Sequence, residues 1–414
     1  MRIAIVGSGV SGLVAARRLY REHAVSVFEA ANRLGGHVHT WQVESGGRTW
    51  AVDTGFIVSN ERNYPEFTRL LAELGVATQP STMSFSVRHD QADLEYNGST
   101  IRQLFVQPGN LVRPAFLRML TEILRFNREA PAEMVRGQDE SLGALLQRSR
   151  YSPAFRDWYL LPMGSAIWSV PLATVLAMPA TFFIRFFQNH GMLTLNDRPE
   201  WRVVTGGSGR YIDALVRPFG GAIRLEQPVL AVRRRNDRVD VNGEPFDRVI
   251  FACHSDQVLA VLEDPTDEER AILGALPYQP NEAILHTDAS VLPRRRGAWG
   301  AWNYRVSRDP TAPVSVTYYL NQLQSLAAPD PICVTLNGAD LIDPARIIGR
   351  VRYDHPVATM AGTAARARRT EISSVRRTHY CGAYWGNGFH EDGVVSGLAA
   401  AAEVATAATK PVAA

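Results

Sequence analysis

The first thirty residues constrain the fold of this chain more tightly than any other segment. The stretch RIAIVGSGVSGLVAARRLYREHAVSVFEA (Arg2 to Ala30) predicts a buried strand, a tight turn, a helix and a second strand. Gly7, Gly9 and Gly12 follow the pattern GxGxxG, in which the first glycine permits the turn, the second lets backbone approach a pyrophosphate, and the third lets helix pack on strand. With Ser11 they begin a helix whose dipole and free N–H groups favour an anion.

An acid stands where a dinucleotide would need one. Glu29, followed by Ala30, ends the second strand at nearly the expected spacing of about 20 residues, where a carboxylate accepts hydrogen bonds from ribose hydroxyls. We therefore predict a dinucleotide site that includes both residues. The alternative is a glycine-rich turn that binds nothing.

Composition limits the remaining possibilities. The 414 residues are 46% hydrophobic and 21% charged, which is ordinary for a folded protein of about two to three domains. A net charge of +3 gives no argument for nucleic acid. Lys410, in the tail, is the only lysine, so a catalytic lysine within the fold is excluded.

The chain shows no sign of export or membrane insertion. Its three cysteines form no CxxC pair, the start MRIAIVGSG does not read as a signal peptide, and no run approaches the ~20 apolar residues of a membrane span. We expect a cytoplasmic protein that could still lie against a membrane. Nothing in the sequence indicates its oligomeric state.

Further segments resemble the flavin amine oxidase and phytoene desaturase superfamily. EAANRLGGHVHTW resembles the segment of that superfamily that passes the pyrophosphate and flavin ring, here with Gly35, Gly36 and His37. WAVDTGFIVSNERNYP resembles the loop along the flavin. There the resemblance implies close approach by four residues, namely Thr54, Gly55, Phe56 and Ile57.

The resemblance continues to the end of the chain. The stretch around Gly206 and Gly207 resembles a returning turn and helix, after which a strand would carry Val229 with its backbone at the adenine. CGAYWGNGFHEDGVVSG resembles the closing segment of the superfamily. There Gly382 would end the last strand, and Asp392 to Val394 would begin a helix aimed at the pyrimidine end of the flavin.

The resemblance implies non-covalently bound FAD and an α/β fold, with a Rossmann-type FAD-binding domain and an inserted α+β substrate domain. Residues 1–80, 200–255 and 370–410 would form the first domain, and residues 81–199 and 256–369 the second. The chain is most similar to a bacterial group of predicted NAD/FAD-binding, amine-oxidase-like proteins. Their association with cyclopropane-fatty-acid-synthase-like enzymes implies a small-molecule or acyl-lipid substrate.

Elimination narrows the chemistry. No redox CxxC, no lysine for the flavin N5 and no complete second nucleotide fingerprint is present, and His37 and His39 lack the partners of a zinc site, so we predict no metal. Candidates for contact with substrate or for proton transfer are Tyr384, Trp385, His390 and Glu391, although aromatic residues in such loops usually pack and an acid there usually caps a helix.

Three functions remain open. The first is hydride transfer from an apolar substrate, such as an acyl chain, to FAD (desaturation or dehydrogenation). The second is a redox-neutral shift of a double bond, and the third is flavin or lipid binding without turnover. The segment Pro114 to Pro131 predicts a helix with Phe116, Leu117, Leu120, Ile123 and Leu124 on one face, and with arginines elsewhere that are either solvated or in contact with anionic lipid.

Overall fold

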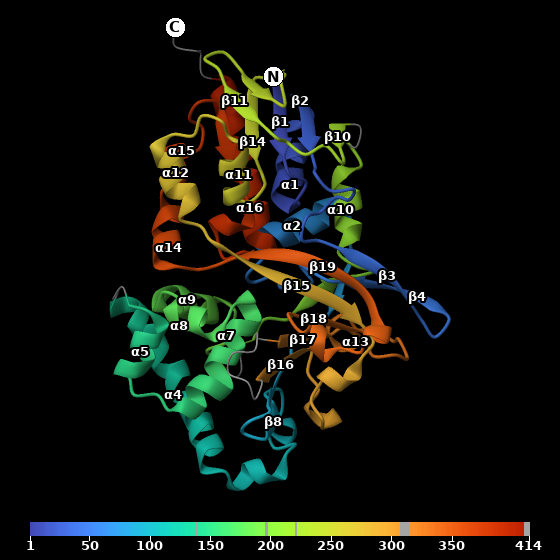
Figure 1. Ribbon diagram of the computed structural model, residues 1–414, viewed down its shortest axis with the longest axis vertical. Coiled ribbons are helices and arrows are strands. Elements are labelled where there is room, and N and C mark those ends of the chain that lie inside the picture. Colours follow the sequence, from blue (N-terminus) through green and yellow to red (C-terminus); the bar gives the residue numbers. More distant parts are fainter. Residues whose placement is uncertain (137–139, 195–197, 220–221, 307–314, 410–414) are drawn as a thin grey trace.

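A parallel sheet forms one end of the molecule. The computed structural model describes residues 1–136, 140–194, 198–219, 222–306 and 315–409 of the chain. Five parallel strands lie in the order β10-β2-β1-β14-β20. Their bounds are β1 Arg2–Val6, β2 Ala24–Phe28, β10 Ile223–Arg224, β14 Arg248–Phe251 and β20 Thr378–Tyr380. The N-terminus lies beside this sheet (Figure 1).

Helices cover both faces of the parallel sheet, which explains the continuous apolar run of β1. Ile3 and Ile5 of β1 pack against four helices on one face of the sheet. Ala4 and Val6 pack on the other face, against four more helices and a small antiparallel sheet. The first four are α1 Val10–Leu19, α2 Pro65–Leu74, α10 Gly209–Val216 and α16 His390–Thr409. The second four are α11 Ser255–Val261, α12 Asp267–Gly274, α14 Met360–Ala367 and α15 Arg369–Ile372. The small sheet comprises β11 Val232–Arg234, β12 Val239–Val241 and β13 Glu244–Phe246.

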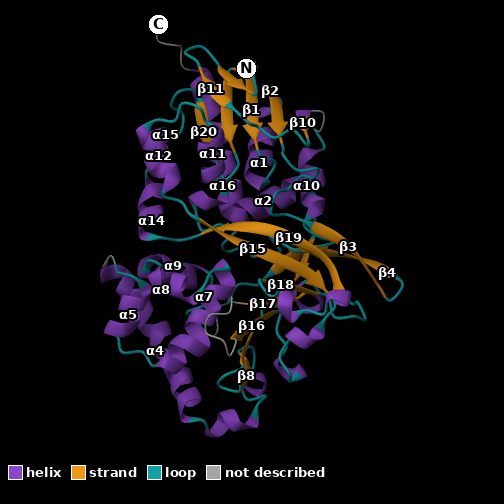
Figure 2. Ribbon diagram, viewed as in Figure 1, coloured by secondary structure: helices purple, strands orange, loops and turns teal. Residues whose placement is uncertain are grey.

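A second, seven-stranded sheet has the order β19-β15-β18-β17-β16-β7-β8. Its strands are β7 Phe85–His89, β8 Leu94–Asn97, β15 Tyr278–His286, β16 Trp302–Val306, β17 Ser315–Tyr319, β18 Cys333–Leu336 and β19 Ile347–Pro356. The long antiparallel pair β15 and β19 crosses the middle of the molecule, between the parallel sheet and the rest (Figure 2).

Small sheets and a helical lobe complete the fold. The two smaller sheets are formed by β3 Thr40–Ser45 with β4 Arg48–Asp53, and by β5 Val58–Ser59, β6 Thr78–Pro80 and β9 Arg202–Val204. The lobe has its own apolar core and contains α4 Pro114–Arg136, α5 Leu142–Arg148, α6 Pro153–Phe155, α7 Leu161–Trp168, α8 Leu172–Ala177 and α9 Ala180–Asn189. No helix in the described ranges is long and apolar enough to cross a bilayer.

The predicted α/β architecture is confirmed, with strand, turn, helix and strand where the first thirty residues place them. The division into two domains at residues 80, 200, 255 and 370 stays a prediction. Helices α11 and α12, which follow residue 255, nevertheless pack on the parallel sheet.

The predicted face of α4 is partly wrong. Phe116 is buried as expected, but Leu117 and Leu124 are 40% and 52% exposed. The buried row instead includes Glu122, whose carboxylate accepts hydrogen bonds from the backbone N–H and the hydroxyl of Ser152. The buried face of α4 thus includes a polar residue whose hydrogen bonds are satisfied, which hydrophobicity alone does not predict.

Candidate functional site

A cavity of about 530 Å³ lies at the carboxyl ends of the parallel strands. Residues at or just after the ends of β1, β2, β14 and β20 all line it, which is where open α/β sheets bind ligands. Eleven predicted cofactor residues line this cavity: Gly7, Gly9, Ser11, Glu29, Ala30, Gly35, Gly36, His37, Phe56, Val229 and Gly382.

The three glycines of the turn have different steric surroundings and therefore different roles. Gly7 has φ +107°, and a Cβ there would lie 2.9 Å from the carbonyl oxygen of Ala252. A Cβ at Gly12 would collide with the carbonyl oxygen of Gly7, so this glycine lets α1 lie against the strand and does not line the cavity. A Cβ at Gly9 would meet no atom within 4 Å, so the space above Gly9 is open and leaves room for a ligand.

The start of α1 suits an anion. Gly9 caps the helix without a side chain, and no acid stands in its first turn, so the free N–H groups and the helix dipole face the cavity without a competing carboxylate. Gly36 closes the cavity from the opposite side. Its φ is +59°, and a Cβ on it would lie only 3.3 Å from the Cα of Gly9. Together these residues form a cradle that fits a pyrophosphate.

Glu29 already holds the turn in place. One carboxylate oxygen accepts hydrogen bonds from the backbone N–H of Ser8 (3.0 Å) and from its hydroxyl (2.6 Å), and the other accepts from the N–H of Ala31 (2.8 Å). A carboxylate offers about four acceptor positions. One position therefore remains for a ribose hydroxyl, so the residues present fit the cofactor that the resemblance implies.

Three histidines and a tyrosine crowd the far end of the cavity. The ring of His37 lies 5.0 Å from that of Tyr353, 5.6 Å from His355 and 5.7 Å from His254, between ring centroids. Burial, followed by repulsion from His355 and His254, lowers the pKa of His37 well below its ordinary value. Burial also lowers the pKa of His254, and it lowers the pKa of His355 to about 4. All three imidazoles are therefore neutral at neutral pH.

Hydrogen bonds fix the tautomer of His355. The side-chain amide of Asn281 donates to His355 Nδ1 (2.7 Å) and to the carbonyl of Gln279 (3.1 Å), while its oxygen accepts from the amide of Asn337 (2.6 Å). The opposite orientation of the Asn281 amide would place two oxygens together at Gln279. His355 Nδ1 must accept, so its proton is on Nε2, and the ring is a neutral donor.

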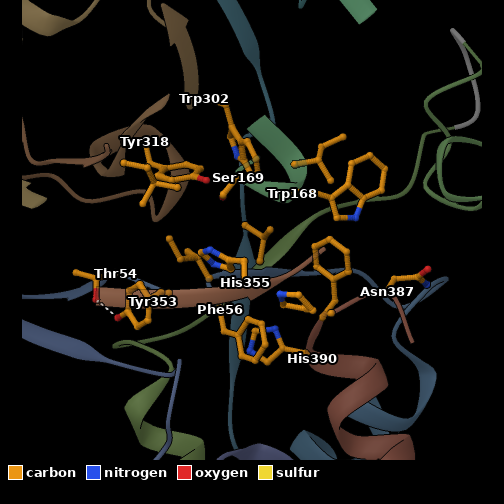
Figure 3. Close-up of a pocket in the computed structure, with 18 of the residues that line it drawn as sticks. Thr54, Phe56, Trp168, Ser169, Trp302, Tyr318, Tyr353, His355, Asn387 and His390 are labelled. Atoms are coloured by element: carbon orange, nitrogen blue, oxygen red, sulfur yellow. Dashed lines mark hydrogen bonds between the residues drawn. The ribbon is translucent and has the colours of Figure 1, made fainter. Parts of the chain in front are cut away.

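A smaller, apolar pocket of about 130 Å³ adjoins the larger cavity and shares Phe56, Tyr353 and His355 with it. In Figure 3, Trp168, Ser169, Trp302 and Tyr318 line one side, while Tyr353, His355, Phe56 and His390 line the other. Thr54 bonds the hydroxyl of Tyr353 at 2.8 Å. Of the predicted flavin-loop residues, Thr54, Gly55 and Ile57 line this pocket and only Phe56 reaches both.

His390 lies in an aromatic stack at the edge of the smaller pocket. Its ring lies 4.6 Å from Phe56 and 4.4 Å from Phe67, and its Nε2 has no hydrogen-bond partner among the described residues. Burial lowers its pKa to about 3. His390 is thus a neutral side chain with a free nitrogen close to the pocket.

The other predicted catalytic residues are placed differently. Tyr384 lines the larger cavity, and burial raises its pKa so that the phenol stays protonated. Trp385 packs in the sheet core and lines neither cavity. Glu391 accepts hydrogen bonds from the N–H groups of Glu66 (3.1 Å) and Phe67 (2.9 Å), so it caps α2. This geometry gives Trp385 and Glu391 no support as substrate-contacting residues.

Three cofactor predictions need correction. Val229 lines the larger cavity but precedes β11, so it is not carried by a strand. Helix α16 begins at His390 and not at Asp392. Asp392 accepts from the N–H of Phe389 (2.9 Å), and Val394 is buried in the core, so neither lines a cavity.

Sequence reasoning missed most of the pocket. His254 and His355 are not among the residues predicted from the sequence, yet both line the larger cavity, and the same is true of Trp168, Trp302 and Tyr318 in the smaller pocket. Tyr353 and His355 alternate on β19 and therefore share one face of that strand. This alternation is the only local signal for them.

Comparisons with known proteins agree with this geometry. The family model for flavin-containing amine oxidoreductases matches residues 10–340. An L-amino acid dehydrogenase of Synechocystis sp. is 24% identical over 57% of this chain and 51% of that protein. A carotenoid phi-ring synthase of Chlorobaculum tepidum is 21% identical over 82% of this chain and 46% of that protein. The chain thus spans about half the length of these relatives.

Solved structures share the whole fold. Cyclohexylamine oxidase from Brevibacterium oxydans superposes with a TM-score of 0.71 at 14% identity over 99% of both chains. A CLA-producing fatty acid isomerase from P. acnes superposes with a TM-score of 0.68 at 14% identity over 98% of both chains. At such identities the likeness shows the fold alone. The family match and the dinucleotide cradle lead to one conclusion: the chain belongs to the flavin-containing amine oxidoreductase family, and its cofactor is FAD.

Proposed function

We propose that this protein is an FAD-dependent oxidoreductase that removes hydride from a carbon of an apolar substrate, most simply an unsaturated or modified fatty acyl chain. One observation carries the proposal, namely the uncharged apolar pocket beside the cofactor cavity. The proposed reaction forms a double bond in the substrate by loss of a hydride and a proton. A quinone or oxygen then takes the two electrons.

The pocket is poorly suited to charged substrates. None of the described residues that line it is Asp, Glu, Lys or Arg, and the two histidines that line it, His355 and His390, are neutral because burial lowers the pKa of each. An ammonium or carboxylate group placed there would be desolvated without a counter-ion, which costs several kcal/mol. The absence of lysine outside the tail also removes the residue that flavin amine oxidases generally place near the flavin N5.

The size of the pocket indicates how a substrate would fit. A cavity of about 150 Å³ holds a benzene molecule, so a pocket of about 130 Å³ accepts a segment of roughly six carbons. A long chain would therefore present a segment to the pocket and keep its ends elsewhere. Such binding suits a reaction in the middle of an acyl chain.

Residues of the chain itself would position the substrate and keep water out of the pocket. Bound FAD accepts a hydride at N5. The indoles of Trp168 and Trp302 and the ring of Tyr318 exclude water from the pocket, and His355 presents a fixed N–H donor where the two cavities meet. His390 lines the pocket with a free ring nitrogen, but its pKa of about 3 makes it too weak a base to keep the substrate proton, so the proton would have to pass on to solvent.

One sequence relative and one fold neighbour are compatible with an apolar substrate and do not identify it. A carotenoid phi-ring synthase is among the sequence relatives, and a fatty acid isomerase shares the fold. The isomerase favours a second candidate, in which the hydride returns to another carbon and no acceptor is needed. Flavin or lipid binding without turnover is the third, and the proposed link to cyclopropane-fatty-acid-synthase-like enzymes stays a prediction.

Anaerobic mixing with linoleate and oleate micelles separates these functions, with hexylamine and L-leucine as charged comparators. Lasting bleaching of the flavin by a fatty acid supports dehydrogenation. A shifted double bond with the flavin still oxidised supports the isomerase instead. If only the amine or the amino acid bleaches the flavin, the assignment of an apolar substrate is overturned. If none of the compounds changes the flavin or its own double bonds, the remaining function is binding without turnover.

A matched pair of variants tests the pocket itself. Ile57→Asp places a carboxylate in the pocket, whereas Ile348→Asp places one at a 39% exposed isoleucine of β19. Ile57→Asp should keep its yellow colour and lose the fatty-acid response. Ile348→Asp should keep both, and an equal response from the two variants would contradict the assignment of the pocket.

A further inference from the structure

The end of the molecule opposite the N-terminus carries exposed apolar side chains. This end is the teal segment at the bottom of Figure 1, which contains α3 (Ile101–Leu104), a short 3₁₀ turn (Pro108–Val112) and the start of α4. We call this segment, residues 101–117, the tip. Four of its large aliphatic residues are exposed: Ile101 by 80%, Leu111 by 55%, Val112 by 81% and Leu117 by 40%.

The charges on the tip are all positive. Residues 96–117 contain two arginines, Arg102 and Arg113, and no Asp or Glu. Arg102 and the adjacent Arg296, on a turn that packs against α3, form no ion pair with any described residue, while Arg113 bonds only the carbonyl of Asp93. The exposed side chain of Asp93 is itself paired with Arg294 at 3.3 Å.

The arginines further along α4 do not extend this charge. Arg118 pairs with Glu122 at 3.2 Å, and Arg125 and Arg128 both pair with Glu129, at 2.9 and 3.3 Å. The basic helix face that the sequence suggested as a lipid contact is therefore neutralised. Within the described part of residues 93–136, the arginines without an ion pair and the exposed aliphatic side chains of the start of α4 therefore lie together at the tip.

We propose that the tip docks on the surface of a lipid bilayer that contains anionic lipids. Aliphatic side chains beside unpaired arginines match the two layers of such a surface, because the side chains enter the acyl boundary while the guanidinium groups meet the headgroup phosphates. A second copy of this chain fits poorly, since a symmetric contact would bring arginines of like charge together. The docking does not depend on which reaction the pocket performs.

Vesicle flotation of the FAD-loaded full chain tests the proposal. Vesicles of phosphatidylcholine with phosphatidylglycerol should carry the protein, pure phosphatidylcholine should carry much less, and salt should release it. Ile101→Ser/Val112→Ser should lower the partition constant at least about tenfold, since each lost methylene is worth about fourfold. Arg102→Ala should lower it about fivefold.

Val135→Ser is the matched control. Val135 is 89% exposed but lies about 30 Å along α4 from the tip, so its loss should leave flotation unchanged. The proposal is overturned if the wild-type protein fails to float with anionic vesicles. It is also overturned if Val135→Ser lowers flotation as much as Ile101→Ser/Val112→Ser does. A tip variant that instead changes the oligomeric state assigns the surface to a second copy. Retained yellow colour separates all of these outcomes from misfolding and from failure of the proposed reaction.

Discussion

Replacing Gly9 and Gly12 separates cofactor binding from folding within one turn. Gly9 has φ −65° and ψ 171°, which any L-residue can adopt, and a Cβ there meets no atom within 4 Å. Gly9→Val should therefore leave the apoprotein folded, at a cost of about 1 kcal/mol or less for the changed helix cap. Its methyl groups would fill the space above the start of α1.

The expected loss of FAD affinity is large. A valine would keep the pyrophosphate from at least two N–H groups of the turn, and a hydrogen bond to a charged group contributes about 1.5–3 kcal/mol. The loss is at least about 3 kcal/mol, or roughly a hundredfold or more, so the purified variant should be colourless. Fluorescence titration of the apoprotein with FAD measures the effect directly.

Gly12→Ala should show the opposite pattern. Its Cβ would collide with the carbonyl of Gly7 and lie 2.9 Å from the Cβ of Ala252, so α1 must move from the strand. Overpacking of this kind costs about 1–3 kcal/mol, which thermal unfolding of the apoprotein detects. A Gly9→Val protein that retains full flavin, or that unfolds as Gly12→Ala does, would refute the assigned roles of the two glycines.

Three other substitutions test the buried polar groups. Glu269→Ala removes the bidentate partner of the buried Arg234, at 2.6 and 2.9 Å, but leaves Asp264 paired with it at 3.2 Å. The free energy of unfolding should therefore fall by about 1.5–3 kcal/mol in denaturant titration, the contribution of a hydrogen bond to a charged group; an effect below about 1 kcal/mol would show that the pair contributes little. Because the folded-state pKa of His390 is about 3, below its ordinary 6.5, the unfolded chain takes up the proton first, and stability is lost as pH falls from 6.5 towards 3. His390 alone should account for roughly 2 kcal/mol of this loss by about pH 5. His390→Phe should reduce the slope of the thermal-stability profile by that share, while other buried histidines such as His37 and His355 keep the remainder; an unchanged slope would contradict the assignment. Asn281→Leu removes the donor to His355 Nδ1, so ¹⁵N spectra should show mixed tautomers with the flavin retained, and an unchanged Nε2–H tautomer would show that Asn281 does not set it.

The nucleotide half of the site could be predicted because its determinants are local. Gly7, Gly9 and Gly12 lie within one turn, and the steric reason for each glycine holds whatever surrounds it. The same is true of Glu29, which ends the neighbouring strand and reaches back to Ser8 across the turn. Short-range geometry of this kind is readable in a sequence.

The substrate half depends on pairing between distant strands. Tyr353 and His355 reach the cavities because β19 pairs with β15, and the tautomer of His355 depends on Asn281, 74 residues away. Glu391 looked like a proton-transfer group beside the flavin, but α2 supplies two N–H donors that hold it as a cap. No local sequence pattern predicts that Asn281 bonds His355 or that Glu391 caps α2.

The uncharged pocket and the apolar tip can be joined in one experiment. An acyl chain that leaves a bilayer for water loses about 0.8 kcal/mol per methylene, so a docked enzyme meets far more substrate than a free one. If both proposals hold, Ile101→Ser/Val112→Ser should slow turnover of linoleate held in anionic vesicles at least about tenfold, in step with its weaker partitioning. The same variant should act normally on linoleate in micelles, which need no docking, whereas Ile57→Asp should fail on both. Equal loss in micelles and vesicles for the tip variant would mean that its side chains act on the site and not at a membrane.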